Sequence, residues 1–380
     1  MSAKRKLRVG VVMGGRSGEH EVSLASARSV MDAMGEEKYD IVPIGITKTG
    51  RWIAGGDPMQ ALAAGDESLS QPAALLGDPS QRGLMRLEDR EEAVEAVRLA
   101  ELDVVFPVLH GPYGEDGTVQ GLLELAGIPY VGAGVTASAL AMDKILFKKV
   151  MVAHGFPVVS DVSLKRKEWE VDPEATMDRI EETLGYPVFT KPANLGSSVG
   201  VSKCSDRAEL ADGLADAAQY DRKLLVETAV PQAREIEVSV LGNDEPIASL
   251  PGEIVPSREF YSYAAKYLDE GEEASDLLIP APLSSAMTER IRQLAVEVYL
   301  AIDCAGMARV DFLLSGETEA LYVNEVNTIP GFTKISMYPK LWEATGIPYS
   351  ELIDRLIELA LERYQDRARS RTSYSVGEAR

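Results

Sequence analysis

Residues 307–327, MARVDFLLSGETEALYVNEVN, contain two strand-like segments separated by a Ser-Gly turn. We expect a hairpin with strands over 308–314 and 320–327 that flank Ser315 and Gly316. Side chains alternate between the two faces of a strand, so Arg309 shares a face with Asp311, and Glu325 shares one with Asn327. If the register brings these faces together, three oxygen donors lie beside one guanidinium group.

Oxygen donors of this kind are typical of a site for Mg²⁺ or Mn²⁺, which prefer hard ligands. Magnesium usually keeps some of its water and relies on substrate phosphates, so the pattern favours a nucleotide triphosphate site over a closed structural site. The alternative is a solvated sheet face that carries a salt bridge. The two strands alone do not decide between them.

A glycine- and serine-rich segment, Lys191 to Gly200 (KPANLGSSVG), lies between two further strand candidates. Glycines allow backbone amides to approach an anion closely, and the lysine adds a positive charge. An ordinary flexible loop has the same composition. The segment matches neither the Walker motif nor the dinucleotide-binding motif, so both of those mechanisms are poorly supported.

The N-terminal part has the pattern of a strand, a tight turn and a helix, over 7–13, 14–19 and 20–34, with Val22, Ala25, Val30 and Met34 on one side of the helix. Further strands are expected at 41–46 and 102–109, which indicates an open α/β layer of mostly parallel strands. Residues 55–100 have the composition of a surface insertion.

Polar residues follow the first and third of these strands, where an open α/β sheet binds its ligands. Glu19 is either an acidic residue favoured by the helix dipole or a receptor for an ammonium group, and its spacing fits both. His110 and Glu115 could face the same cleft, although a lone histidine is often a structural hydrogen-bonding group.

The middle of the chain indicates a small α+β unit. A short helix at 116–126, a strand at 128–131 and a long helix at 136–154 lead into it. Its own strands are expected at 188–191, 198–203 and 223–227, and its helices at 173–184 and 206–219. The segment 234–241 alternates polar and apolar residues, which predicts a strand with one buried and one wet face. A helix at 284–302 follows, and 366–380 is expected to be a mobile tail.

The composition is that of a folded acidic protein with more than one domain. The chain has 380 residues, 45% hydrophobic and 26% charged, with a net charge of −21. This charge argues against nucleic-acid or anionic-membrane partners. The sequence has no apolar run long enough to span a membrane and no signal-peptide layout, so we expect a cytoplasmic protein. Cys204 and Cys304 are expected to be core residues.

Seven segments, in order, resemble the D-alanine–D-alanine ligase family of the ATP-grasp superfamily. They are GGRSGEHEVS (14–23), HGPYGEDGTVQGLLELAGIPYVG (110–132), MDK (142–144), KPANLGSSVG (191–200), REIEVSVLGN (234–243), MARVDF (307–312) and NEVNTIPGFTKISMYP (324–339). The resemblance is nearly chain-wide and implies a fold that combines α/β and α+β parts. It places an open parallel-sheet, Rossmann-like layer in an N-terminal domain (1–138), followed by central (139–229) and C-terminal (230–365) domains that grip ATP, and a tail (366–380).

The resemblance also implies ATP and metal ligands. Lys144, Lys191 and Lys266 would contact phosphates, Glu227 and Val230 would lie against adenine, and Glu235 would hold the ribose. The family often has a lysine where this chain has Thr228. Two Mg²⁺ or Mn²⁺ ions would bind Asp311, Glu325 and Asn327.

The implied reaction joins two D-alanine molecules through an acyl phosphate, for peptidoglycan precursor synthesis. The resemblance implies that Glu19 binds the ammonium of the first D-alanine and that His110 lies near its carboxylate. Arg309 and the Gly331 amide would stabilise the oxyanion, and Ser336 and the Met337 amide would bind the carboxylate of the second D-alanine. Ser197, with Tyr267, would assist deprotonation of the second amine and hold a lid at 261–269. Family members are usually homodimers. A related ligase for D-serine or D-lactate and an ATP-binding scaffold without turnover are the alternatives.

Overall fold

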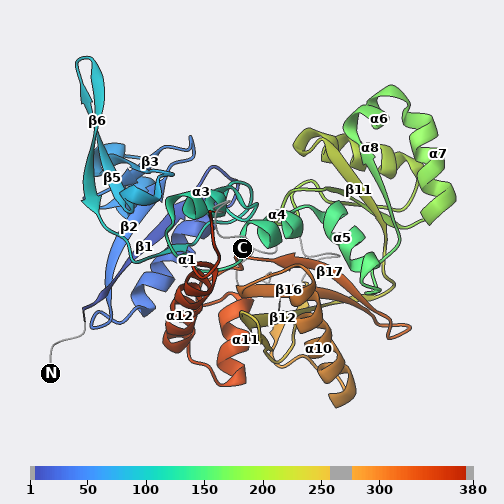
Figure 1. Cartoon of the computed structure of the whole chain (residues 1–380). Coiled ribbons are helices and arrows are strands. Elements are labelled where there is room, and N and C mark those ends of the chain that lie inside the picture. The colour runs from blue at the N-terminus through green and yellow to red at the C-terminus, as the bar shows by residue number, and fades with distance from the viewer. Residues whose placement is uncertain (1–4, 257–275, 374–380) are drawn as a thin grey trace, which may run out of the picture.

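The computed structural model describes residues 5–256 and 276–373. Lys266, Tyr267 and the expected lid segment 261–269 therefore lie outside the described residues. Three sheets of seven, four and six strands organise the chain. In Figure 1 the N-terminal sheet and the four-stranded sheet stand on opposite sides of the molecule, and the C-terminal sheet lies below and between them.

The N-terminal sheet has the order β6-β5-β4-β3-β2-β1-β7. The strand β1 (Leu7–Gly14) pairs in parallel with β2 (Tyr39–Ile46) and β7 (Val104–Pro107), as expected. The expectation of a mostly parallel layer fails beyond these three, because the remaining strands are antiparallel: β3 (Trp52–Ala54), β4 (Gln71–Leu75), β5 (Leu84–Arg90) and β6 (Ala93–Ala100).

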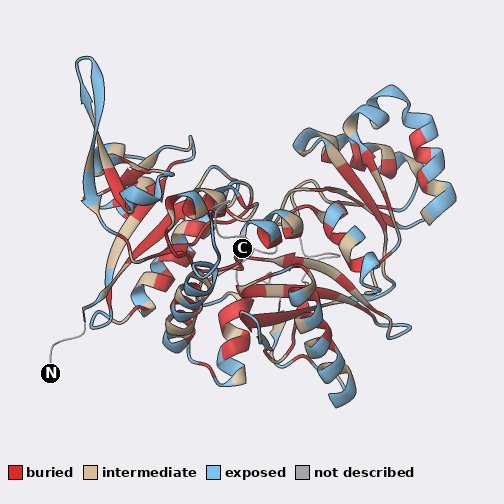
Figure 2. Ribbon diagram, viewed as in Figure 1, coloured by how far each residue is buried: buried red, intermediate tan, exposed pale blue. Residues whose placement is uncertain are grey.

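Residues 55–100 therefore extend this sheet and are not a separate surface insertion. They also form the helices α2 (Pro58–Ala64), η1 (Glu67–Leu69) and η2 (Pro79–Gln81). The links from β4 to β5 and from β5 to β6 are too short for the crossover that a parallel pair needs, so these strands form hairpins. Figure 2 shows that the outer hairpin, β5 and β6, is exposed at its tip.

Helix α1 (His20–Ala33) packs on this sheet through a face that is partly polar. The predicted apolar side is wrong at Ala25, which is exposed, while Ser23, Ser26 and Ser29 are buried. The hydroxyl of Ser23 accepts from the Gly14 amide at 2.8 Å and donates to the carbonyl of Val108. Serine can be buried here because backbone groups satisfy its hydroxyl.

The predicted helix at 116–126 is α3 (Thr118–Ala126), and Gly127 ends it. The predicted strand at 128–131 is wrong, since it is reduced to one bridge between Val105 and Tyr130. The predicted long helix at 136–154 is two helices, α4 (Val135–Met142) and α5 (Lys144–Ala153). Asp143 interrupts them in a non-helical conformation, and its carboxylate accepts from the Leu146 amide and pairs with Lys223.

The central sheet is entirely antiparallel, in the order β10-β9-β11-β8. It comprises β8 (Asp161–Lys165), β9 (Val188–Pro192), β10 (Ser202–Cys204) and β11 (Lys223–Thr228), with α6 (Arg166–Val171), α7 (Pro173–Leu184) and α8 (Arg207–Tyr220). The strand expected from Ser198 begins only at Ser202. Ser197 and Ser198 have φ values of 52° and 57°, which are incompatible with an extended strand.

The C-terminal sheet has the order β15-β14-β12-β16-β17, with β13 beside β12. The predicted hairpin is confirmed as β16 (Gly306–Ser315) and β17 (Leu321–Asn327). The other elements are β12 (Ala233–Gly242), β13 (Ile247–Ala248), β14 (Gly252–Val255), β15 (Asp276–Leu278), α10 (Ser285–Ala301), α11 (Met337–Thr345) and α12 (Tyr349–Arg367).

The predicted wet face of β12 is wrong, because Glu237 and Ser239 are both buried. Glu237 lies 3.0 Å from Arg309 Nε on the neighbouring strand. Ser239 donates to the carbonyl of Tyr338 in α11, which packs over this side of the strand. Alternation in the sequence therefore separated the two faces correctly, but neighbouring strands and α11 bury Glu237 and Ser239 on the face that was expected to be wet.

One hydrophobic core joins the N-terminal sheet to the C-terminal helices. Val9 and Phe106 of the sheet belong to the same buried cluster as Trp342 of α11 and Leu356 of α12. Cys204 and Cys304 are free and buried, as predicted. Among the described residues no helix is long and apolar enough to cross a membrane. We propose that the three sheets correspond to the domains 1–138, 139–229 and 230–365; α12 runs slightly beyond the last boundary.

Leu356→Ala tests whether this shared core stabilises the whole chain. Leu356 is fully buried, so the truncation leaves a cavity and is expected to lower the free energy of unfolding by about 2–5 kcal/mol. Urea unfolding followed by circular dichroism measures the change. Val171→Ala, at an exposed position, is the control; equal midpoints for the two variants would contradict the prediction.

Candidate functional site

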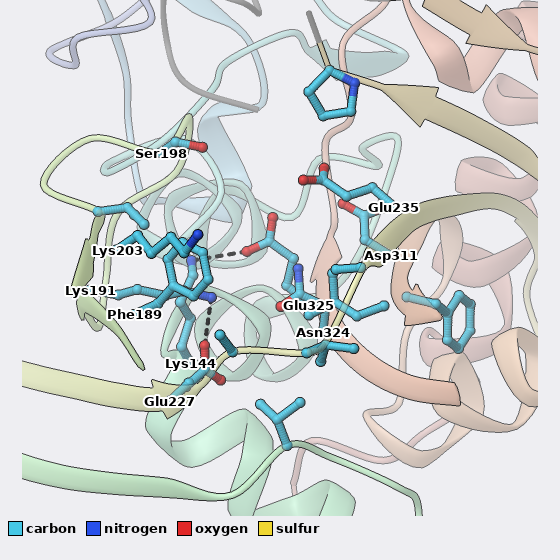
Figure 3. A pocket seen from close by; sticks show the side chains of 18 of the residues that line it. Lys144, Phe189, Lys191, Ser198, Lys203, Glu227, Glu235, Asp311, Asn324 and Glu325 are labelled. Atoms are coloured by element: carbon cyan, nitrogen blue, oxygen red, sulfur yellow. Dashed lines mark ion pairs between the residues drawn. The ribbon is translucent and has the colours of Figure 1, made fainter. Parts of the chain in front are cut away.

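A cavity of about 550 Å³ lies between the four-stranded sheet and the C-terminal sheet. Figure 3 shows side chains from both sheets, and from the start of α5, around this space. The predicted site residues that line it are Lys144, Lys191, Ser197, Glu227, Val230, Glu235, Arg309, Asp311 and Glu325. Residues that are far apart in the sequence therefore line the same cavity.

The hairpin brings its polar residues together as the alternation predicted. The register places Arg309 opposite Asn327 and Asp311 opposite Glu325. Arg309 holds the carboxylate of Asp311 through two contacts of 2.7 Å, and Asn327 Nδ2 donates to the same carboxylate at 2.9 Å. Lys144 Nζ lies 3.1 Å from Glu325 Oε2. Positive side chains thus accompany both carboxylates.

This donor set suits a magnesium ion that shares its coordination with a substrate. Within residues 5–256 and 276–373, no group of three or more His, Cys, Asp or Glu side chains is placed to hold a metal ion by itself. The hairpin offers two carboxylates, and the amide of Asn327 keeps its carbonyl oxygen for a cation because its nitrogen donates to Asp311. Water and phosphate oxygens would complete the coordination that Mg²⁺ requires.

A buried cluster of charges forms another part of the cavity wall. Glu227 lies between two lysines, 2.7 Å from Lys148 Nζ and 2.5 Å from Lys191 Nζ. Burial raises the pKa of Glu227, but the charges of Lys191 and Lys148 outweigh that effect and hold it at about 2. Burial lowers the pKa of Lys191, and Glu227 more than reverses this, so its pKa is raised. Both groups are therefore charged near neutral pH.

Sequence reasoning missed Lys148, which also contacts Asp161 Oδ1 at 3.3 Å and the Val159 carbonyl at 2.8 Å. The available signal was its spacing, since Lys148 is one helical turn after Lys144. Glu237 was also missed as a partner of Arg309, although it follows Glu235 at strand spacing. Both side chains are buried, which the sequence pattern did not indicate.

A second group of predicted residues lies where the N-terminal sheet meets the other two. Ser197 donates its hydroxyl hydrogen to the carboxylate of Glu19. Ser17 supports Glu19 by accepting from its amide at 3.2 Å, and its hydroxyl donates to the His110 carbonyl at 2.8 Å. The loop after β9 is thereby tied to the start of α1, as the predicted link between Ser197 and Glu19 requires. Tyr267, the third member, lies outside the described residues.

His110 and Glu115 meet at Ile329, in the segment that follows β17. Ring atom Nδ1 of His110 lies 3.0 Å from the Ile329 carbonyl oxygen, and the Ile329 amide donates to Glu115 Oε1 at 3.2 Å. Burial lowers the pKa of His110. Burial and the charge of Glu19 raise the pKa of Glu115 to about 8. The two side chains therefore lie together, although neither lines the 550 Å³ cavity.

Gly331, Ser336 and Met337 lie in the same segment and at the start of α11. Ser336 immediately precedes α11, and its hydroxyl accepts from the Thr333 amide at 3.1 Å. The Met337 side chain packs with Ile254 and Leu341, so only its backbone is suited to a polar ligand. Gly331, Ser336, Met337 and Asn327 do not line the 550 Å³ cavity, and neither do Glu19 and His110.

Glu227→Gln tests the charge cluster through the pH dependence of stability. The folded-state pKa of Glu227 is below its usual value of 4.5, so its charge stabilises the fold above that pH, and the contribution is lost as the pH falls towards about 2. The variant should be less stable than the wild type at pH 7, and the difference should shrink between pH 4.5 and 2. Urea midpoints across this range measure it; a pH-independent difference would contradict the assignment.

Comparisons with known proteins agree along the whole chain. Residues 8–133 match the family described as "D-ala D-ala ligase N-terminus", and residues 150–358 match "D-ala D-ala ligase C-terminus". A D-alanine--D-alanine ligase of Natranaerobius thermophilus is 50% identical over 98% of this chain and 99% of its own length, and one of Thermoanaerobacter sp. (strain X514) is 52% identical over 96% and 99%.

Solved structures give the same result for the fold. The D-alanine-D-alanine ligase from Coxiella burnetii is 37% identical, with a TM-score of 0.80 over 96% of both chains. VanG D-Ala:D-Ser ligase from Enterococcus faecalis is 36% identical, with a TM-score of 0.81 over 94% of this chain and 100% of its own. The agreement of sequence, fold and cavity leads to one conclusion: this chain belongs to the D-alanine–D-alanine ligase family, with the ATP-grasp fold.

Proposed function

We propose that this protein is an ATP-dependent ligase that joins two D-alanine molecules into D-alanyl-D-alanine for peptidoglycan precursor synthesis. Relatives of about half-identical sequence over nearly the full length carry this name. One observation carries the proposal. Asp311 and Glu325 of the hairpin line the same cavity as Lys144 and Lys191. Two carboxylates for a metal and two lysines for phosphates are what activation by ATP requires.

The first step makes a carboxylate reactive by transferring phosphate to it. Because a carboxylate and a triphosphate are both anions, the site must neutralise charge as they approach. Lys144 and Lys191 would contact phosphates, with Glu235 and Val230 on the nucleotide side of the cavity. Asp311, Glu325 and Asn327 would hold two Mg²⁺ or Mn²⁺ ions, which supply further charge neutralisation when bound.

The second step needs an amine without its proton and an acyl phosphate protected from water. Glu19 would receive the ammonium of the first D-alanine, and Ser197, which donates to Glu19, would assist deprotonation of the second amine. Arg309 would stabilise the oxyanion. Burial lowers the pKa of Arg309, but the charges of Asp311 and Glu237 outweigh burial and raise it well above its usual value, so Arg309 stays charged. Ser336 and the Met337 amide would receive the second carboxylate.

The likeness to VanG D-Ala:D-Ser ligase favours one alternative, in which D-serine is the second substrate. The two activities share the nucleotide, the metal and the first D-alanine, so the cavity described above does not separate them. We also propose that the protein acts in the cytoplasm and as a homodimer; light scattering at known concentration tests the second point.

Purified protein with ATP, Mg²⁺ and D-alanine is expected to form ADP, phosphate and D-alanyl-D-alanine. Removal of the metal with EDTA should abolish product, and added Mg²⁺ should restore it. Asp311→Asn is expected to lower kcat by about 10²- to 10³-fold, because it weakens a metal ligand and the partner of Arg309. Asp244→Asn, an exposed aspartate, is the control and should retain full activity. Phosphate release without dipeptide would contradict the proposal.

Tyr267→Phe tests the choice of second substrate. In the family a tyrosine at this position accompanies D-alanine, and a phenylalanine accompanies members that form depsipeptides. The variant is expected to raise the ratio of D-alanyl-D-lactate to D-alanyl-D-alanine when both second substrates compete. Mass spectrometry of the products measures this ratio. An unchanged ratio would show that Tyr267 does not set the specificity.

A further inference from the structure

The segment Ile329–Phe332, which follows β17, has an unusual set of backbone partners. The Ile329 amide donates to Glu115 Oε1 at 3.2 Å, and its carbonyl oxygen lies 3.0 Å from His110 Nδ1. The Phe332 amide donates to Ser26 Oγ at 3.2 Å, and its carbonyl accepts from the Tyr349 hydroxyl at 2.6 Å. Both backbone groups of each terminal residue are therefore held by side chains.

These side chains come from distant parts of the chain. Ser26 is in α1, His110 and Glu115 follow β7, and Tyr349 begins α12. The side chains of Ile329 and Phe332 are themselves buried in the core that joins these elements. A connection that only linked β17 to α11 would not need so many long-range partners, since loop backbone is commonly satisfied by local groups or water.

Ser26 occupies the centre of this network. The Ile329 carbonyl can only accept a hydrogen bond, so Nδ1 of a neutral His110 ring carries the proton. Nε2 then accepts, and its partner at 3.2 Å is Ser26 Oγ, whose O–H donates while its lone pair accepts from the Phe332 amide. A neutral ring agrees with burial, which lowers the pKa of His110. The donor and the acceptor of each hydrogen bond from Ile329 through His110 and Ser26 to Phe332 are therefore fixed.

The network leaves one amide of the segment available. Pro330 has no N–H group, and in the part of the chain that the structure describes, the Gly331 amide has no hydrogen-bond partner. A Cβ atom at Gly331 would lie 2.8 Å from Ser336 Oγ, so a larger residue at this position would displace the serine hydroxyl. Gly331 therefore lies beside the serine proposed to receive the second carboxylate.

We infer that Ser26 and Tyr349 are positioning residues that hold the Gly331 amide in place as a donor to the oxyanion of the tetrahedral intermediate. The inference rests on the proposed ligase function. A preorganised donor stabilises charge in the transition state without stabilising the bound substrates equally. Loss of either hydroxyl should therefore lower kcat more than it changes KM.

The test compares Ser26→Ala and Tyr349→Phe with the control Ser23→Ala. Ser23 is in the same helix, is equally buried and bonds to backbone, but its partners are Gly14 and Val108. Loss of Ser26 or Tyr349 is expected to lower kcat for dipeptide synthesis about 10- to 100-fold, with KM for ATP within about twofold. The control should lower Tm by a similar amount and keep kcat within about twofold of the wild type.

The double variant adds a second readout. Because both hydroxyls hold the same residue, its loss of kcat should be smaller than the product of the single losses. If both single variants keep the wild-type kcat, or if kcat falls in all three variants in proportion to Tm, the positioning role is wrong while the ligase function stands. If the wild type forms no dipeptide, the proposed function fails, and the inference fails with it.

Discussion

The compensation of buried charges around one cavity is the constraint on which the site depends. Arg309 is held between Asp311 and Glu237, and Glu227 between Lys148 and Lys191. A buried ion costs several kcal/mol unless it is paired, so removing one member of such a group leaves an expensive charge behind. The second group joins α5 to the central sheet, and the pair of Lys144 with Glu325 at 3.1 Å joins α5 to the C-terminal sheet.

The same pairing makes a chain with a net charge of −21 able to receive a polyanion. Lysines and an arginine are concentrated at the cavity, and carboxylates pair with Lys144, Lys191 and Arg309. Under the proposed function, phosphate groups and divalent cations would bring charges of both signs, so they would enter together without leaving either set of side chains unpaired. Local charge, not the net charge of the molecule, decides what the site binds.

The N-terminal sheet meets the other two sheets through hydrogen bonds at one edge. Ser197 reaches Glu19 from the loop after β9, and His110 and Glu115 reach Ile329 after β17. These contacts lie where the carboxyl ends of β1 and β7 meet the rest of the molecule, which is where open α/β sheets place ligands. The cavity and the group around Glu19, His110 and Ile329 are thus built by different elements, and the N-terminal sheet shares its core with α11 and α12.

The sequence by itself determined the hairpin and the residues on its polar face, because alternation along a strand is a local property that needs no partner. It also determined the family, since seven motifs in order identify it. Only the tertiary structure decided which faces are interior: α11 covers Ser239, Arg309 pairs with the buried Glu237, and distant backbone groups bond to the buried Ser23 and Ser26 of α1. The break at Asp143, which pairs with Lys223, and the partners of Ile329 and Phe332 also depend on residues far away in the chain. Burial and long-range hydrogen bonding are set by packing, and packing is not encoded in any single local pattern.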